Sequence, residues 1–84
     1  MYIAFVIGDN WHYANGKHFG GHINLVSTGR PFANQIDAIT TAFNELKDIY
    51  KNVEVVSKKG LKADYHNELD VDGRQFDIYC IKLQ

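Results

Sequence analysis

Residues 34–50 read NQIDAITTAFNELKDIY, and this segment decides the fold class of the chain. Its apolar residues recur at spacings of three and four: Ile36, Ile39, Ala42, Phe43, Leu46, Ile49 and Tyr50. That period predicts a helix with one wide apolar face. We expect Asn34 to cap the helix, Asp37 to lie favourably in its first turn, and Asn52 to stop it in a left-handed conformation.

Apolar runs and period-two alternation predict strands on both sides of this helix. The predicted strands cover residues 2–7, 22–27, 53–57, 64–72 and 76–83. Between the last two, Asp72-Gly73 is typical of a two-residue hairpin turn. Residues 8–21, rich in Gly and Asn, are interpreted as one long loop.

Together these elements predict a single domain over residues 1–84, in the order ββαβββ. The fold class is α+β, with two layers: a single helix packed on a mainly antiparallel sheet of four to five strands. The first and last strands are apolar on both faces, so both are expected to be covered on both sides. One helix covers only one sheet face. The loop, a second copy of the chain or another protein must therefore cover the other.

Composition and charge exclude several classes. The formal net charge is −1, which gives no reason to expect tight DNA binding. The single cysteine, Cys80, cannot form an internal disulfide and fits a reducing compartment, so we expect a cytoplasmic protein. No apolar run approaches the roughly 18 residues of a membrane span, and the first run ends too early, at Gly8, for a signal peptide.

The 10–19 segment has the composition of a protein-contact surface, because Trp and Tyr supply large contact area and Asn and Gly adapt to a partner. The candidate partner-binding residues are Asn10, Trp11, His12, Tyr13, Asn15, Lys17, His18 and Phe19. In the alternative interpretation, Trp11 and Phe19 fold back to cover the second sheet face. The two interpretations are not exclusive.

A basic stretch over Lys47–Lys62 raises nucleic-acid or nucleotide binding as an alternative function. The candidate residues are Arg30, Lys51, Lys58, Lys59 and Lys62. Aromatic residues on a sheet face, namely Tyr2, Phe5 and Tyr79, would then stack on bases. Asp48 and Glu54 interrupt this stretch, and an acidic strand follows it.

Catalytic and metal chemistry is weakly indicated. The histidines His12, His18, His22 and His66 match no zinc signature. Residues 68–73 imitate the start of a calcium loop but have Tyr79 at the twelfth position, where an acid is needed. We therefore predict no metal, no cofactor and no enzyme. A metal-assisted phosphoesterase using His12, His22 or His66 is the third hypothesis.

The leading prediction is a small, non-catalytic binding module. It docks on a partner protein through the 10–19 segment and the open sheet face, as an inhibitor or adaptor of a larger enzyme. The bias toward Phe, Tyr, Ile, Asn and Lys is common in AT-rich genomes, which suggests a virus or mobile element as the source. Without its partner, the chain is expected to form a homodimer through that face.

Overall fold

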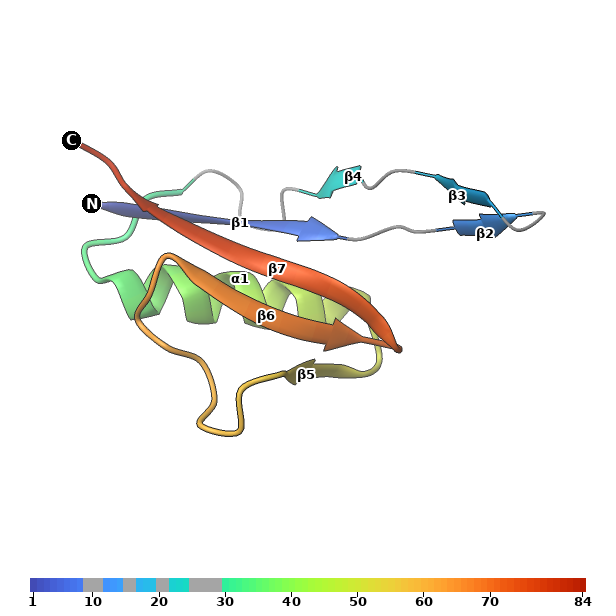
Figure 1. Cartoon of the computed structure of the whole chain (residues 1–84). Helices are drawn as coiled ribbons and strands as arrows, with labels where there is room; N and C mark the ends of the chain where they lie inside the picture. Colours follow the sequence, from blue (N-terminus) through green and yellow to red (C-terminus); the bar gives the residue numbers. More distant parts are fainter. Residues whose placement is uncertain (9–11, 15–16, 20–21, 25–29) are drawn as a thin grey trace.

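The computed structural model describes the backbone of residues 1–8, 12–14, 17–19, 22–24 and 30–84 and the side chains of residues 1–8 and 30–84 (Figure 1). In chain order the elements are β1 (Tyr2–Gly8), β2 (His12–Ala14), β3 (Lys17–Phe19), β4 (His22–Asn24), α1 (Gln35–Ile49), β5 (Val53–Val55), β6 (His66–Val71) and β7 (Arg74–Lys82).

Five of the strands form one antiparallel sheet in the order β4-β1-β7-β6-β5, with α1 on one of its faces. This is the predicted α+β fold of one helix on an antiparallel sheet. β1 and β7, the first and last strands of the chain, pair at the centre of the sheet from Tyr2↔Lys82 to Gly8↔Phe76. β2 and β3 form a separate two-stranded sheet.

The predicted loop over residues 8–21 is wrong at the backbone level, because β2 and β3 pair as an antiparallel hairpin. In that hairpin Ala14 pairs with Lys17, so two residues separate the strands. Their sequence is Asn15-Gly16, and Asn-Gly between short strands is itself a strong hairpin signal. Of the predicted strand over residues 22–27, β4 covers His22–Asn24, and residues 25–27 lie outside the described part of the chain.

The helix begins and ends where the apolar period predicts, but its ends are built differently. Asn34 occupies the N-cap position without a side-chain bond to the helix backbone, and its Nδ2 donates to Asp37 Oδ2 at 3.1 Å instead. Asn52 does not provide a left-handed stop. Tyr50 ends the helix in an extended conformation, and Asn52 Nδ2 donates to Asp72 Oδ1 at 3.0 Å.

The buried stripe of the helix is narrower than predicted. Ala38, Ile39, Ala42 and Leu46 are buried. Phe43 and Tyr50 pack against the core from its margin. By contrast, Ile36 in the first turn is 38 % exposed, and Ile49 in the last turn, beyond the last buried residue, is 65 % exposed.

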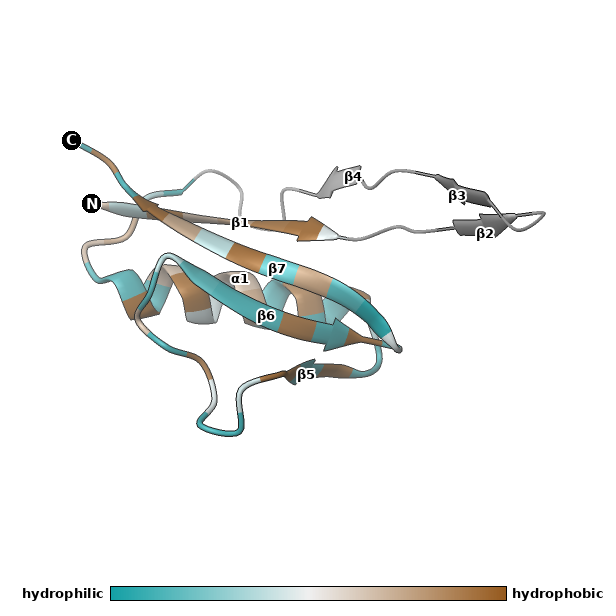
Figure 2. Ribbon diagram, viewed as in Figure 1, coloured by the Kyte–Doolittle hydropathy of each residue, from teal (hydrophilic) through white to brown (hydrophobic). Residues whose placement is uncertain are grey.

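The core lies between α1 and one face of the sheet. From the sheet it includes Ala4, Val6, Leu69, Val71, Phe76, Ile78 and Cys80. These residues alternate with more exposed ones along each strand, which is visible as alternating brown and teal along β6 (Figure 2). Burial raises the pKa of the Cys80 thiol, which disfavours the reactive thiolate.

At the end of β1, Gly8 permits a close approach to the core. A Cβ at this position would lie 2.8 Å from a ring carbon of Phe76. Phe76 can therefore fill the space beneath β1 because Gly8 has no side chain. The ring also packs edge-on against Tyr50, with the centroids 5.3 Å apart.

The β6–β7 hairpin is confirmed. Asp72 and Gly73 form its turn with φ values of 52° and 80°, the left-handed conformation expected of Asp-Gly in a two-residue hairpin. The alternation breaks down at the start of β6, because the strand begins at His66. Tyr65, expected on the buried side, is 65 % exposed.

Candidate functional site

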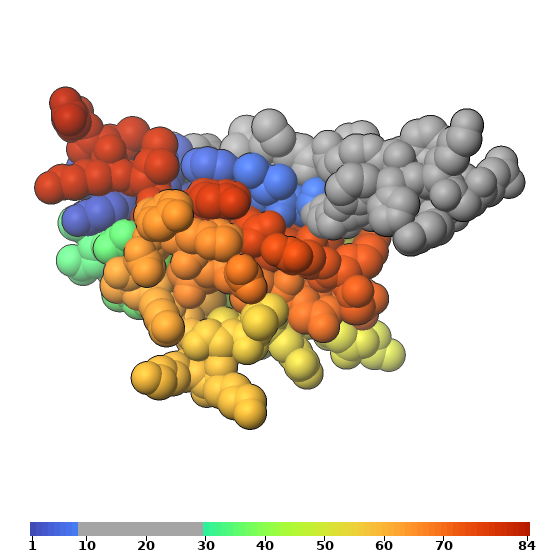
Figure 3. All heavy atoms as spheres, viewed as in Figure 1, coloured from blue at the N-terminus to red at the C-terminus, as the bar shows by residue number. Residues whose placement is uncertain are grey.

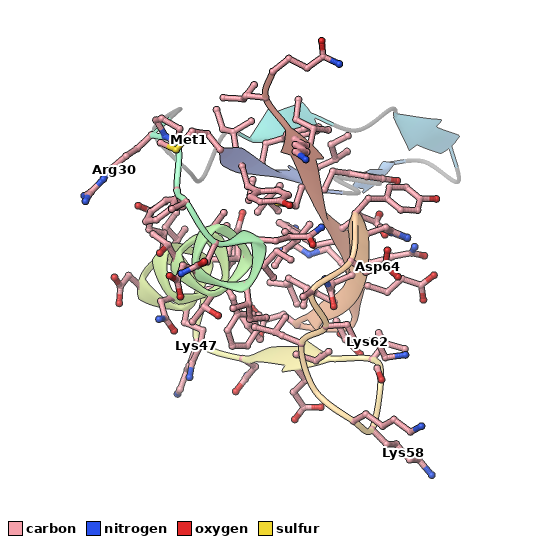
Figure 4. All side chains as sticks on the ribbon, turned by 90° about the vertical axis from the view of Figure 1, so that its left-hand side faces the viewer. Met1, Arg30, Lys47, Lys58, Lys62 and Asp64 are labelled. Atoms are coloured by element: carbon pink, nitrogen blue, oxygen red, sulfur yellow. The ribbon has the colours of Figure 1, made fainter. Side chains whose placement is uncertain are left out.

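The sheet face turned away from α1 carries the chemistry of this molecule. Figure 4 shows α1 on one side of the sheet, and no other described element forms a layer on the opposite side. Figure 3 views that opposite side, with β1 in blue and β6 and β7 in orange and red. Strand register assigns the residues of this open face: Ile3, Phe5, Ile7, Glu54, His66, Glu68, Asp70, Gln75, Asp77, Tyr79 and Ile81.

One half of the open face is apolar and aromatic. Phe5 on β1, Tyr79 on β7 and His66 on β6 are direct cross-strand neighbours. Their rings form a ladder, which we call the aromatic ladder. The Phe5 and Tyr79 centroids are 5.7 Å apart, and those of Tyr79 and His66 are 4.7 Å apart with only 13° between the ring planes. Exposed Tyr65 extends the ladder, at 6.1 Å from the His66 ring.

Within residues 1–8 and 30–84, the covering predicted for both faces of β1 is found on the face toward α1. Ile3, Phe5 and Ile7 remain half-buried on the open face, whereas Ala4 and Val6 are buried beneath α1. The predicted grouping of Tyr2 with Phe5 and Tyr79 is also wrong. Side chains alternate along a strand, so Tyr2 lies on the helix side, where it packs against the core.

The other half of the open face is acidic. Glu54 on β5 lies directly opposite Asp70 on β6, and Glu68 on β6 lies directly opposite Asp77 on β7. Like charges directly opposite one another destabilise a sheet. Among residues 1–8 and 30–84, no Lys or Arg makes an ion pair with these four carboxylates. We call these four residues the acidic half.

A contact between His66 and Asp77 joins the two halves. His66 Nε2 lies 2.7 Å from Asp77 Oδ1, with the two side chains 26 % and 17 % exposed. This contact and the stacking on Tyr79 hold the imidazole in place. Asp70 also has a local role, since its Oδ1 accepts a hydrogen bond from the Gly73 amide at 2.8 Å.

Two shallow hollows flank Asp70. One, of about 280 Å³, is lined in part by Val56, Glu68 and Gln75, and the other, of about 260 Å³, includes Glu54 and Asp72. Small-molecule pockets usually span about 300–1,000 Å³ and are mostly apolar. These polar hollows fit an inserted side chain better than a small-molecule ligand. No group of three or more candidate metal ligands occurs in the described residues.

Two of the histidines in the phosphoesterase hypothesis, His22 and His66, lie on strands that are not neighbours in the sheet. His22 lies on β4 and His66 on β6, with β1 and β7 between them. Three inter-strand spacings separate these strands by about 14 Å, since neighbouring strands lie about 4.8 Å apart. The side chains of His12 and His22 lie outside the described residues.

The predicted partner-binding residues fall where side chains are not described. Asn10, Trp11 and Asn15 lie outside the described residues altogether. Of the others only the backbone is described: His12 and Tyr13 in β2, and Lys17, His18 and Phe19 in β3. Their contribution to binding stays a prediction.

The predicted basic residues are divided among separate sites. Lys58, Lys59 and Lys62 are exposed in the segment that joins β5 to β6. Arg30 lies across the molecule from Lys58 (Figure 4), with its guanidinium 5.3 Å from the Phe32 ring centre. Lys51 is exposed just after α1.

Comparisons of the chain with models of protein families, with curated proteins and with solved structures gave no match. In the part of the chain that the structure describes, no helix has the length and apolarity to cross a membrane. The chemistry of the open face is therefore the best indication of function.

Proposed function

We propose that this chain is a non-catalytic binding module that docks on a partner protein through the open face of its sheet. One observation carries the proposal: a sheet face that no other described element covers has an aromatic ladder beside two directly opposed carboxylate pairs. The carboxylate pairs cost stability in the isolated chain. Residues that break a local rule of stability in this way are typical of functional surfaces.

The extent of the open face over four strands supports a protein as the ligand. A standard interface buries about 800 Å² on each partner, which is roughly a seventh of the 5658 Å² exposed by this chain. The strands β1, β7 and β6 contribute side chains across the face, from Ile3 on β1 to Glu68 on β6. A fourth strand, β5, adds Glu54. An apolar centre beside a polar margin is the usual anatomy of such an interface.

A binding role accounts for the site better than catalysis does. Phosphoester chemistry usually needs a second histidine or a metal beside the first histidine, and the backbone of His22 lies three strands away from His66. We propose that the chain acts inside the cell, where a single thiol stays reduced. It acts there by blocking or adapting a larger protein.

The test compares two exposed isoleucines that differ in position. Ile81 is 49 % exposed on the open face, and Ile49 is 65 % exposed at the end of α1. Wild type, Ile81→Asp and the control Ile49→Asp are each used to capture partners from a lysate of the source cells. We expect one protein to be recovered in stoichiometric amount with wild type and Ile49→Asp, and at least tenfold less with Ile81→Asp.

Thermal unfolding of each variant verifies that all three are folded. Equal recovery with both variants, or loss only with Ile49→Asp, would overturn the open face as the docking site. Recovery of the chain alone, as a dimer, would overturn docking on a different protein. Tyr79→Ser, which removes the central ring of the ladder, provides a second variant should Ile81→Asp unfold.

A further inference from the structure

The open face has a chemistry that selects its occupant. We propose, on the basis of the docking function above, that the partner presents an arginine-bearing basic segment. An arginine of that segment stacks on the aromatic ladder and pairs with the carboxylates of the acidic half.

Charge complementarity excludes the other occupants. Among residues 1–8 and 30–84, the side chains that strand register places on the open face include four carboxylates and no Lys or Arg. A nucleic acid would bring phosphates against Glu54, Glu68, Asp70 and Asp77, and like charges in an interface are strongly unfavourable. A second copy stacked face to face would bring the same four carboxylates and no cation. A basic protein segment is the occupant that these charges favour.

The aromatic ladder distinguishes arginine from lysine. A guanidinium is planar, stacks on aromatic rings and binds carboxylates through two parallel hydrogen bonds, whereas an ammonium is a compact, strongly hydrated point charge. The rings of Tyr79 and His66 stack on each other, 13° from parallel, so a planar guanidinium would add to the outer face at the end of this stack. Tyr65, 65 % exposed, adds a third ring beside them.

The register places carboxylates within reach of an arginine on this surface. Glu68 is the diagonal neighbour of Tyr79, because it lies two residues beyond the directly opposite His66. Diagonal neighbours are about 7–8 Å apart, which long side chains can bridge. Glu68 and Asp77 are directly opposite each other, so a single guanidinium between them would relieve their repulsion.

The experiment uses two synthetic peptides as probes, an Arg-Gly repeat and a Lys-Gly repeat of equal length and charge. Each is titrated into isotope-labelled full-length protein, and binding is followed by NMR shifts of backbone amides. We expect the Arg-Gly peptide to bind at least about threefold more tightly than the Lys-Gly peptide. The largest shifts should fall on His66, Asp77 and Tyr79, and the affinity should fall as salt rises.

Matched single-charge variants locate the pairing. Glu68→Gln removes a carboxylate from the open face, and the control Asp48→Asn removes one from an exposed position on α1. We expect Glu68→Gln to weaken binding of the Arg-Gly peptide about threefold to fivefold, and Asp48→Asn to leave it unchanged. Equal losses for the two variants would mean that overall charge, not this surface, attracts the peptide, and would overturn the proposal.

Other outcomes separate this inference from the docking function. Equal affinity for the two peptides, no binding of either, or shifts of the open-face amides on addition of oligo-dT alone would overturn the arginine-bearing partner. A protein captured by wild type and lost with Ile81→Asp would still support docking through the apolar half. Loss of both results would overturn the docking function as well.

Discussion

On the sheet face that α1 covers, the side chains of Val6, Phe76 and Ile78 are fully buried, whereas on the open face Tyr79 is half-buried and Ile81 is 49 % exposed. The same strands contribute to both faces, since consecutive residues point to opposite sides. Burial of apolar area is the main source of folding free energy. The covered face therefore holds the fold together, and the open face contributes less to stability.

The largest effect that separates the two faces is expected from truncating Phe76. Its ring is fully buried and fills the space between Gly8 and Tyr50. We expect Phe76→Ala to lower the free energy of unfolding by about 3–5 kcal/mol, as large-to-small changes of buried aromatics do. Urea unfolding followed by circular dichroism measures this loss.

Ile81→Ala is the matched truncation on the open face. Because Ile81 already contacts water, we expect a loss below about 1.5 kcal/mol, less than the stabilisation gained by fully burying an aliphatic side chain. If Ile81→Ala destabilised the chain as much as Phe76→Ala, the open face would be part of the core. The contrast between the two faces would then be wrong.

The spacing of apolar residues along the sequence predicted most of the residues that are buried on the covered face. The helix stripe through Ile39, Ala42 and Leu46 and the odd positions Leu69 and Val71 of β6 are buried as their spacing predicts. Period alone does not say where a stripe ends. Ile49 follows the helical spacing and is still 65 % exposed, because burial also depends on what lies opposite the last turn.

A second, smaller effect is expected at the one polar residue found buried in the described part of the chain. Asn67 takes an inward position on β6 and is 5 % exposed. Its amide bonds both the N–H and the C=O of Lys62, each at 2.9 Å. We expect Asn67→Ala to cost about 1–3 kcal/mol of unfolding free energy, because two backbone groups lose their partners.

Hydrogen exchange gives a local readout for this variant. The Lys62 amide should exchange faster in Asn67→Ala, while the Cys80 amide, bonded to the Tyr65 carbonyl at 2.8 Å, should keep its protection against local opening. Unchanged exchange at Lys62 would mean that Asn67 does not anchor the segment between β5 and β6.

Two cross-strand pairs of the open face could have been predicted from the sequence. Counting outward from the predicted turn at Asp72-Gly73 pairs His66 with Tyr79 and Glu68 with Asp77, as the structure does. Hairpin register thus contained both the ladder contact and the opposed acids. The place of Phe5 beside Tyr79 could not be obtained this way, because β1 and β7 are joined by no hairpin and their register depends on the whole fold.

The smallest expected change in unfolding free energy tests whether the opposed carboxylates of the open face lower the stability of the chain. Glu54 lies directly opposite Asp70, so Glu54→Lys replaces a repulsion by an attraction. We expect the free energy of unfolding to rise by about 0.2–1 kcal/mol. The gain should disappear in 1 M salt, where screening acts over about 3 Å. In an Asp70→Asn background the same substitution should give no gain, because the opposing charge is gone.

Glu54→Lys should also weaken binding of the Arg-Gly peptide. A variant that is both more stable and a poorer binder is the result expected of a surface kept acidic for a basic partner. A loss of stability in Glu54→Lys would instead mean that the opposed carboxylates do not repel each other on this face, and the physical reason for assigning it a cationic partner would fail.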